Sequence, residues 1–452
     1  MVLKQFTYID LFAGPGGLCT GFKSAGLKPL IAVEISGNTV LTYSSSHDAE
    51  IYELENLKQH MGKLELILQK SDKTCLIHGD INEVSNDLIR EILLKKFNVS
   101  KVDIVAGGPP CESFSMAGKR LEDDDRNDLF SNLLRIAHAV DSKFVFFENV
   151  PGLLTKKREG IDGGQFKYIL NKFGEKSEQS GNSYILASDK IEVVKCLASD
   201  YGVPQKRERI FLVGCNSKFG ENPFKYPEKT HGPGRKYPYV TVGEALSYLP
   251  EINSGEGGDC LNYTCEYVKD FKNGKISESM YEFMKFIHGD GYYVPNHLKY
   301  DNNKVMFHKA LNHRPNMVER FKYIKQGEGM KKAAERLLEE GKEDVVKQVF
   351  PNKLYAARNR RLKSDEPCFT VTSHCLDEMI HPFLDRQLTP REVARLQSFP
   401  DWYIVEGPYV KFHSDPEQDK YEQIGDAIPV LLTKALGESL FNALVELEKN
   451  NM

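Results

Sequence analysis

The chain has 452 residues, 40% hydrophobic and 27% charged, which is typical of a globular protein of two or three domains with a sizeable core. A formal net charge of −4 excludes a polycation that attracts nucleic acid over its whole surface, so any such contact must be local. Nine scattered cysteines without a CxxC pair, no apolar run of membrane-spanning length and no cleavable signal pattern predict a cytoplasmic protein with reduced thiols and no metal.

The first half of the chain alternates short apolar runs with helical patterns. Strands are predicted at 7–12, 29–34, 75–79, 102–107, 144–148, 191–197 and 209–214. Between them lie stretches such as 127–140, where apolar residues recur at spacings of three and four. Because the strands are almost continuously hydrophobic, they should be buried on both faces. The pattern predicts an α/β domain with a doubly wound, mostly parallel sheet of the Rossmann-like type.

The first predicted strand leads into a glycine-rich turn, "AGPGGL", at residues 13–18. Glycines allow the backbone to turn tightly and to approach a ligand ahead of a helix. The turn is not a full GxGxxG motif and is weak on its own. Glu34 follows about 20 residues later, where an acid can bind ribose hydroxyls.

The third predicted strand ends at Asp80. This carboxylate suits an adenine amino group or a ribose, and it equally suits the N-terminus of a helix as a cap. The sequence leaves both roles open.

The fourth predicted strand delivers the stretch "GGPPCESFS", residues 107–115. Pro109 and Pro110 fix two φ angles and remove two backbone donors, so the loop is rigid and presents Cys111. A thiol becomes nucleophilic only as a thiolate. The alternative is a structural cysteine beside a stiff turn.

The next strand ends in "FFENVPGLL", which places Glu148 and Asn149 at the same edge of the sheet as Cys111. A carboxylate at the end of an apolar strand is costly unless it is paired or used, and a cap or an ion pair is the alternative to a catalytic role. Further on, "QKRER" places Gln205, Arg207 and Arg209 at alternate positions, so they should share one side of a strand. Such a row suits phosphates or carbonyl oxygens, or a solvated edge strand.

From residue 216 onward the chain is rich in Gly, Pro and Lys and less periodic, which predicts a second domain at 241–417. The first domain would be 1–240, completed by 418–452, because the apolar terminal helix at 428–450 should dock on it. Residues 330–349 predict one amphipathic helix. The basic stretch 353–363, with Tyr355 interleaved, is either a nucleic-acid contact or a solvated surface run.

Six motifs in order make the chain resemble the DNA cytosine-C5 methyltransferases of the single-chain bacterial restriction–modification type. They are "DLFAGPGGL", "GGPPCESFS", "FFENVPGLL", "YGVPQKRERIFLVG", "RQLTPREVARLQSFPD" and "QIGDAIP", spread from residue 7 to about 440. The irregular stretch at about 250–385 lies where that family has its variable target-recognition region.

The resemblance implies S-adenosylmethionine as cofactor and double-stranded DNA as substrate. It implies that Cys111 attacks C6 of a flipped cytosine, that Glu148 engages N3 and the exocyclic amine, and that Arg207 and Arg209 steady the ring carbonyl and its neighbours. The implied cofactor residues are Phe12, Ala13, Gly14, Pro15, Gly16, Gly17, Leu18, Glu34, Ile35, Asp80, Ile81, Pro110 and Asp426. The expected DNA contacts are Gln205, Lys353, Arg358, Arg360 and Arg361.

Two positions depart from the family pattern. Asp426 stands in "IGDAIP" where the family usually has Asn, which puts an amide contact to the methionine part of the cofactor in doubt. Glu112 stands where Gln is commoner, and a carboxylate beside Cys111 raises the thiol pKa unless it points away.

We therefore expect a methyltransferase that makes 5-methylcytosine at a short specific DNA sequence, acting as a monomer without an obligate protein partner. A cognate restriction endonuclease would act separately. The alternatives are a tRNA cytosine-C5 methyltransferase, which the long second domain disfavours, and a catalytically silent DNA-binding protein, which the set Cys111, Glu148 and Arg209 disfavours.

Overall fold

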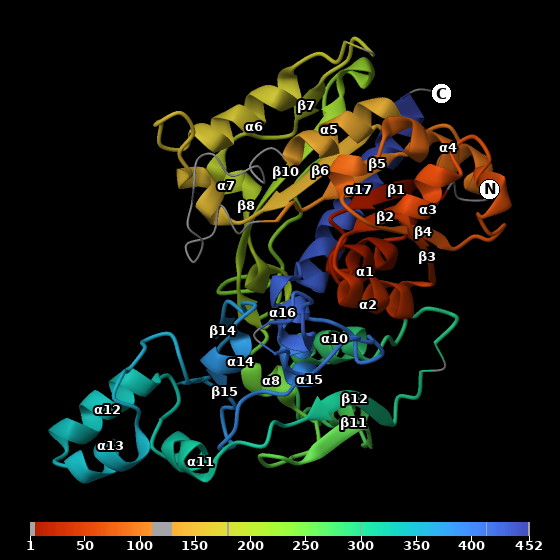
Figure 1. Ribbon diagram of the computed structural model, residues 1–452. Helices are drawn as coiled ribbons and strands as arrows, with labels where there is room; N and C mark the ends of the chain where they lie inside the picture. The colour runs from red at the N-terminus through yellow and green to blue at the C-terminus, as the bar shows by residue number, and fades with distance from the viewer. Residues whose placement is uncertain (1–4, 111–128, 179, 299, 413, 451–452) are drawn as a thin grey trace. The chain divides into compact units, whose positions relative to one another are not determined.

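The computed structural model describes residues 5–110, 129–178, 180–298, 300–412 and 414–450. The chain divides into two compact units (Figure 1). Unit 1 comprises residues 1–197, 208–228 and 432–452, and unit 2 comprises 198–207 and 229–431. Compared with the predicted domains, residues 198–207, 229–240 and 418–431 group with unit 2.

Unit 1 is built on a central sheet of nine strands among the described residues. The strands are β1 (Thr7–Leu11), β2 (Lys28–Glu34), β3 (Ala49–Glu53), β4 (Thr74–His78), β5 (Ile104–Gly107), β6 (Phe144–Asn149), β7 (Tyr184–Leu186), β8 (Lys195–Leu197) and β10 (Glu208–Asn216). Their order is β3-β4-β2-β1-β5-β6-β10-β7, and β8 also pairs with β10. Only β10 runs antiparallel to its neighbours within this sheet. The predicted doubly wound, mostly parallel α/β fold is confirmed.

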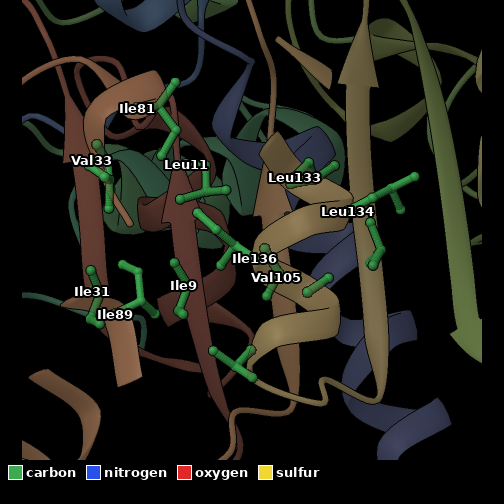
Figure 2. Packing of buried hydrophobic residues seen from close by; sticks show 14 of the residues in the cluster. Ile9, Leu11, Ile31, Val33, Ile81, Ile89, Val105, Leu133, Leu134 and Ile136 are labelled. Atoms are coloured by element: carbon green, nitrogen blue, oxygen red, sulfur yellow. The ribbon is translucent and has the colours of Figure 1, made fainter. Parts of the chain in front are cut away.

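Helices cover both faces of this sheet, as the period-two alternation of side chains requires. Ile9 and Leu11 of β1 pack towards α4 (Asn86–Phe97) and α5 (Phe130–Ala139) (Figure 2). Tyr8, between them, points to the other face and contacts Phe22 of α1 (Gly17–Ser24) with ring centroids 5.3 Å apart. The other helices of unit 1 are α2 (Gly37–His47), α3 (Leu54–Gln59), α6 (Gly164–Gly174) and α7 (Ile191–Val194), with 3-10 turns η1 (Leu64–Leu66), η2 (Ile81–Glu83), η4 (Pro151–Thr155) and η6 (Ser217–Phe219).

The terminal helix α17 (Val430–Asn450) docks on unit 1, as predicted. Thr433 Oγ1 donates to the Gly17 carbonyl at 3.1 Å, and Phe441 packs edge-to-face on Phe6 at 5.3 Å. The stretch Lys420–Asn450 is long and apolar enough to cross a membrane by length and composition. Half of its apolar window is buried inside the protein, which is also how a core helix behaves.

One strand prediction in unit 1 is wrong in detail, and two strands were missed. The segment 191–197 is helix α7 followed by the short strand β8 and is not one strand. The strands β3 and β7 were not predicted, because β3 (AEIYE) carries glutamates among its apolar residues and has only one buried residue, and β7 has only three residues. Edge strands of this kind lack the apolar run that reveals a buried strand.

Unit 2 packs short helices around two apolar clusters. The larger cluster joins α8 (Val242–Leu246), α10 (Glu278–Ile287), α15 (Pro390–Leu396) and α16 (Lys420–Asp426). The smaller one joins α11 (Pro315–Lys322), α12 (Met330–Glu339) and α13 (Glu343–Val349). The single helix predicted at 330–349 is therefore two helices, because Gly341, with φ +73°, ends the first.

Short strand pairs complete unit 2. The pairs are antiparallel β11 (Gly257–Asn262) with β12 (Lys304–Lys309), parallel β13 (Arg360–Arg361) with β15 (Met379–Ile380), and parallel β9 (Gln205–Lys206) with β14 (Cys368–Phe369). The remaining elements are α9 (Tyr267–Lys272), α14 (Cys375–Glu378) and the 3-10 turn η5 (Ala198–Tyr201).

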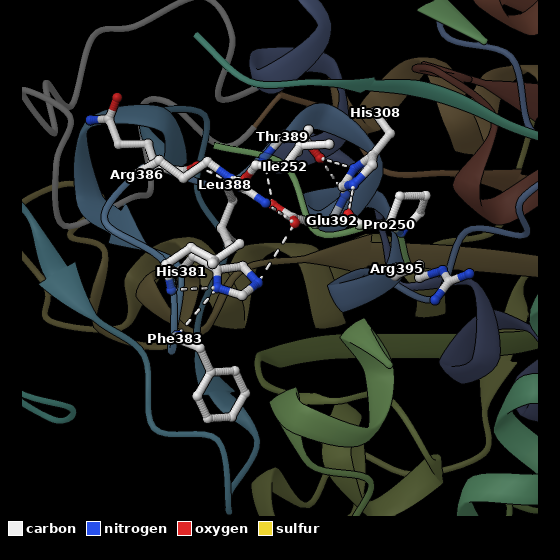
Figure 3. A network of polar contacts seen from close by, with 12 residues as sticks. Pro250, Ile252, His308, His381, Phe383, Arg386, Leu388, Thr389, Glu392 and Arg395 are labelled. Carbon is white, nitrogen blue, oxygen red and sulfur yellow. Dashed lines mark hydrogen bonds and ion pairs between the residues drawn. The ribbon is translucent and has the colours of Figure 1, made fainter. Parts of the chain in front are cut away.

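A buried polar network holds α15 in place (Figure 3). The Arg386 guanidinium forms a two-pronged pair with Glu392, each N–O distance being 2.7 Å, and the Thr389 N–H donates to the same carboxylate. His308 Nδ1 lies 2.9 Å from Thr389 Oγ1. Despite burial, the Arg386 charge holds the pKa of Glu392 well below its usual range. Because a buried ion pair is expensive to break, the network fixes one packing of the helix.

Candidate active site

The backbone between β1 and α1 forms a tight turn at the carboxyl edge of the sheet. Phe12 (φ +57°), Gly14 (φ +56°) and Gly16 (φ +89°) all have left-handed backbone conformations. The turn closes through the Gly16 N–H, which donates to the Ala13 carbonyl at 3.1 Å, and α1 begins at Gly17. Left-handed φ values cost little at glycine, so "AGPGGL" suits this course of the chain.

Glu34 at the end of β2 joins this turn. Its carboxylate accepts the N–H of Gly14 at 2.8 Å, of Ile35 at 2.9 Å and of Ser36 at 3.0 Å. Burial raises the pKa of Glu34, and these backbone donors partly offset that rise. The structure thus brings the predicted acid and the glycine turn together at the edge between β1 and β2. Ile35, next along, is 63% exposed.

His78 is a residue of this edge that the sequence did not reveal. It ends β4, and its ring bridges the Ile35 carbonyl (Nε2–O 3.2 Å) and the Glu53 carboxylate (Nδ1–O 3.0 Å). The clue would have been its position two residues before Asp80, near the end of a predicted strand.

Asp80 acts as a helix cap in this structure. Its carboxylate accepts the Asn82 N–H at 2.9 Å at the start of η2, and it remains half-buried. Ile81, beside it, is buried in the main core of unit 1. Capping, one of the two roles left open for Asp80, is therefore present, and a ligand role remains a proposal.

The ends of β6 and β10 bring Glu148 and Arg209 together. Arg209 Nε lies 2.9 Å from Glu148 Oε1, and both side chains are about nine-tenths buried. The pairing follows from the antiparallel register, in which Phe211 is opposite Glu148. The Arg209 guanidinium thus holds the buried Glu148 carboxylate at one oxygen and fixes its orientation.

The segment that leads to Cys111 runs against the same carboxylate. A Cβ placed on Gly108 would lie 2.5 Å from Glu148 Oε2, so only glycine leaves room for the carboxylate there. Asn149 Nδ2 donates to the Pro109 carbonyl at 3.3 Å, which fastens the Pro-Pro segment to the end of β6. Pro110 is exposed, while Cys111 and Glu112 lie outside the described residues. Gly108 was not predicted as a site residue, although the two consecutive glycines before "PPC" could have indicated it.

Gln205, Arg207 and Arg209 do not share one side of a single strand, contrary to the sequence prediction. Gln205 ends in unit 2, fully buried, with its amide donating to the Leu396 carbonyl at 3.2 Å and accepting the Val371 N–H at 2.8 Å. Arg207 is also buried in unit 2 and donates to the Val371 carbonyl. Arg209 alone belongs to unit 1, because β9 ends at Lys206 and β10 begins at Glu208.

The basic stretch 353–363 divides into outward and inward residues. Lys353 and Arg358 lie over the exposed ring of Tyr355, at 5.0 and 5.1 Å from its centroid. Arg360 instead stacks on Phe369 at 3.3 Å, and Arg361 is buried and donates to backbone carbonyls, including Ile324 at 2.7 Å.

The expected DNA contacts of Gln205 and Arg361 therefore do not fit their placement, because both side chains are used inside unit 2. Lys353 and Arg358 remain available at the surface. Asp426 is exposed and accepts a hydrogen bond from Gln418 Nε2 at 2.8 Å.

Comparisons with known proteins agree with this fold. The family described as C-5 cytosine-specific DNA methylase matches residues 6–442. The Type II methyltransferase M.DdeI of Desulfomicrobium norvegicum is 31% identical over 434 residues, covering 96% of this chain and 88% of the relative. M1.HphI of Haemophilus parahaemolyticus is 29% identical over 442 residues, covering 96% and 87%.

Among solved structures, a putative DNA modification methyltransferase encoded within an E. coli prophage has the same fold. Its TM-score is 0.63 at 23% identity, covering 98% of this chain and 100% of the other. Together with the match over residues 6–442, this fold places the chain in the C-5 cytosine-specific DNA methylase family, as a DNA cytosine-5 methyltransferase.

Proposed function

We propose that the protein transfers a methyl group from S-adenosylmethionine to C5 of a cytosine within a short specific sequence of double-stranded DNA. The observation that carries this proposal is the buried pair of Glu148 and Arg209, 2.9 Å apart, beside the Gly108–Pro110 segment that leads to Cys111. Covalent activation of a pyrimidine needs a fixed carboxylate beside the segment that carries the nucleophilic thiol.

The residues at the carboxyl edge of β1 and β2 fit the cofactor. Glu34 offers its carboxylate to ribose hydroxyls, and the left-handed turn from Phe12 to Gly16 brings backbone close to a ligand. Ile35, exposed beyond Glu34, offers an apolar surface for adenine, with Asp80 and Ile81, which follow the neighbouring strand β4, as further candidates. When bound, S-adenosylmethionine supplies an electrophilic methyl group.

Cys111 and Glu148 would divide the chemistry of the ring between them. The Cys111 thiolate forms a bond to C6, and electron density moves towards N3 and C5 while Glu148, carrying a proton, donates a hydrogen bond to N3. C5 then takes the methyl group and gives up its hydrogen as a proton to water, and the electron pair of that C–H bond expels the Cys111 thiolate as the bond between sulfur and C6 breaks. Arg209 keeps the Glu148 carboxylate at one orientation throughout. Arg207 is buried in unit 2 and donates to the Val371 carbonyl, so its contact with the ring carbonyl stays a prediction from the resemblance.

The target cytosine must leave the stacked duplex to reach this chemistry. Base flipping costs a few kcal/mol, which phosphate contacts repay. Lys353 and Arg358, exposed around Tyr355, are the residues we propose for such contacts. The relatives named as Type II methyltransferases support a role as the modification enzyme of a restriction–modification system. We propose that the protein acts there as a monomer in the cytoplasm.

Transfer of tritium from labelled cofactor tests the substrate. We expect label in duplex DNA of mixed sequence and none in tRNA, and label in tRNA alone would replace DNA by RNA as substrate. Duplex that contains 5-fluorocytosine should trap a covalent adduct with the wild type.

Variants test the nucleophile. C111S should form no adduct and turn over at less than about one thousandth of the wild-type rate, whereas Cys260→Ser, at an exposed cysteine of unit 2, should behave as wild type. Trapping and turnover by C111S at the wild-type level would overturn the assignment of the nucleophile.

A further inference from the structure

The carbonyl of Gly16 is held by donors from two helices. It accepts the Thr20 N–H at 2.9 Å and the Thr20 hydroxyl at 2.8 Å, both within α1. A third contact comes from His47, the last residue of α2, whose Nε2 lies 3.2 Å from the same oxygen. His47 Nε2 also lies 3.3 Å from Thr20 Oγ1.

The partner atoms decide the proton position on His47. A carbonyl oxygen can only accept, so Nε2 must carry a hydrogen that points at Gly16. The ring is fully buried and packs on Tyr43 at a centroid distance of 4.8 Å, which fixes its plane. A buried polar ring aimed at one backbone oxygen is a specific contact between α2 and the turn.

This contact falls on one of the left-handed residues of the turn. Gly16 has φ +89°, and Phe12, a non-glycine residue, has φ +57°. The helix that carries His47 packs against β2, β3 and β4, and β3 begins two residues after it, at Ala49. His47 therefore ties the end of the turn to a rigid part of the sheet.

We propose that His47 is a positioning residue for the cofactor: through its Nε2–H bond to the Gly16 carbonyl it holds the turn between β1 and α1 in the shape that binds S-adenosylmethionine. This inference rests on the proposed function, because it assigns the turn to that cofactor. His47 is buried behind the turn and does not touch the ligand itself.

Pre-organisation predicts a specific effect of removing this donor. Without it, Gly16 still has both Thr20 donors, so folding should suffer little. In the cofactor-free protein the turn then gains conformational freedom. Binding must remove this freedom again, so the affinity for the cofactor falls. Glu148 belongs to β6, and Cys111 follows β5 in the chain, so neither reacting group is part of the turn. The rate at saturating cofactor should therefore not change.

Calorimetric binding of S-adenosylhomocysteine to the full-length protein tests this. His47→Phe keeps the ring and loses the donor, and its Kd should rise about five- to tenfold, from the loss of one hydrogen bond. His47→Gln restores a donor near Nε2 and should bind within about twofold of wild type. The KM for S-adenosylmethionine should rise with the Kd while kcat stays within about twofold.

Two further variants keep the test decisive. Thr20→Val removes the other side-chain donor with little change of shape and should weaken binding in the same direction, whether or not His47→Phe folds. His138→Phe, at a histidine of α5 that packs on Tyr184 at 4.9 Å, is the control and should leave the Kd unchanged.

The outcomes separate this inference from the proposed function. If the wild type binds and both His47→Phe and Thr20→Val keep its Kd, the inference fails and the cofactor assignment stands. A lower melting temperature with an unchanged Kd would show a merely structural role and would also overturn it. If the wild type binds neither compound, the cofactor assignment fails and the inference with it.

Discussion

At Gly108 the backbone before Cys111 closely approaches the Glu148 carboxylate. An added Cβ would lie 2.5 Å from Glu148 Oε2, and the other carboxylate oxygen is held by Arg209 at 2.9 Å. The carboxylate can move away from a methyl group, but only by giving up its geometry with Arg209. Gly108 thus affects the orientation of the acid more than the stability of the fold.

We therefore expect Gly108→Ala to fold normally and to lose about 100-fold in kcat, since a displacement of about 1 Å at a catalytic group has that effect. Methyl transfer to duplex DNA measures the rate, and circular dichroism measures folding. Gly174→Ala is the matched control, because nothing lies within 4 Å of a Cβ at that position. A Gly108→Ala enzyme with wild-type kcat would contradict the tight fit between Gly108 and Glu148.

At the residue scale, strand ends were predictable and pairings were not. Glu148 and Glu34 could be placed at the sheet edge because a carboxylate after an apolar run marks where a strand ends. The placement of Arg207 could not be predicted. It lies at the break between β9 and β10 and belongs to unit 2, and the alternating pattern of "QKRER" does not reveal this break. Likewise a basic run does not show that Arg361 turns inward to backbone carbonyls.

Among elements, α1 and α17 approach each other at Gly21. A Cβ on Gly21 would lie 2.1 Å from Thr433 Oγ1 and 2.6 Å from the Lys434 backbone nitrogen. The terminal helix can dock only because this position has no side chain, and a backbone atom cannot move aside as a side chain can.

Gly21→Ala should consequently destabilise unit 1 by about 1–3 kcal/mol, the usual cost of overpacking. The sign is diagnostic, because glycine to alanine inside a helix otherwise stabilises by about 1 kcal/mol. Urea unfolding followed by circular dichroism measures the difference, and Gly174→Ala, at the end of α6, should be neutral or slightly stabilising. A more stable Gly21→Ala protein would exclude the close packing of α1 on α17.

The elements themselves were predictable where burial is complete. The strands β1, β2, β4, β5, β6 and β10 match apolar runs in the sequence. The break between α12 and α13 was missed because both helices continue one amphipathic pattern, and they are separated only by residues 340–342 with the left-handed Gly341. Periodicity reports which face is buried and does not report where a helix stops.

For the molecule as a whole, acid should destabilise unit 2. Burial lowers the pKa of His381 to about 4, and its Nδ1 accepts the N–H groups of Phe383 and Leu384, which a proton there would displace. Burial also lowers the pKa of His308 in the same network. The unfolded chain takes up the His381 proton near pH 6.5 and the folded protein only near pH 4, so stability present at neutral pH is lost as the pH falls through this window, and His308 acts in the same direction.

Trp402, the only tryptophan of the chain, is buried in unit 2 and reports on its unfolding. Urea unfolding followed by its fluorescence should give a free energy of unfolding that decreases from pH 6.5 to pH 4, by up to about 1.4 kcal/mol per pH unit for each histidine. His381→Asn keeps an acceptor near Nδ1 and cannot titrate, so its slope should be shallower by up to one proton. An unchanged slope would remove His381 from the explanation.

DNA binding is the last property of the whole molecule, and its salt dependence follows from the charge distribution. With a net charge of −4, attraction to phosphates has to come from a few exposed cations such as Lys353 and Arg358. Lys353→Ala and Arg358→Ala should each weaken binding to all sequences and reduce the slope of log affinity against log salt by about 1. Lys347→Ala, at an exposed lysine of α13, is the control and should leave the slope unchanged, as fluorescence anisotropy of labelled duplex can measure. Equal slopes for all three variants would mean that phosphates contact another part of the protein.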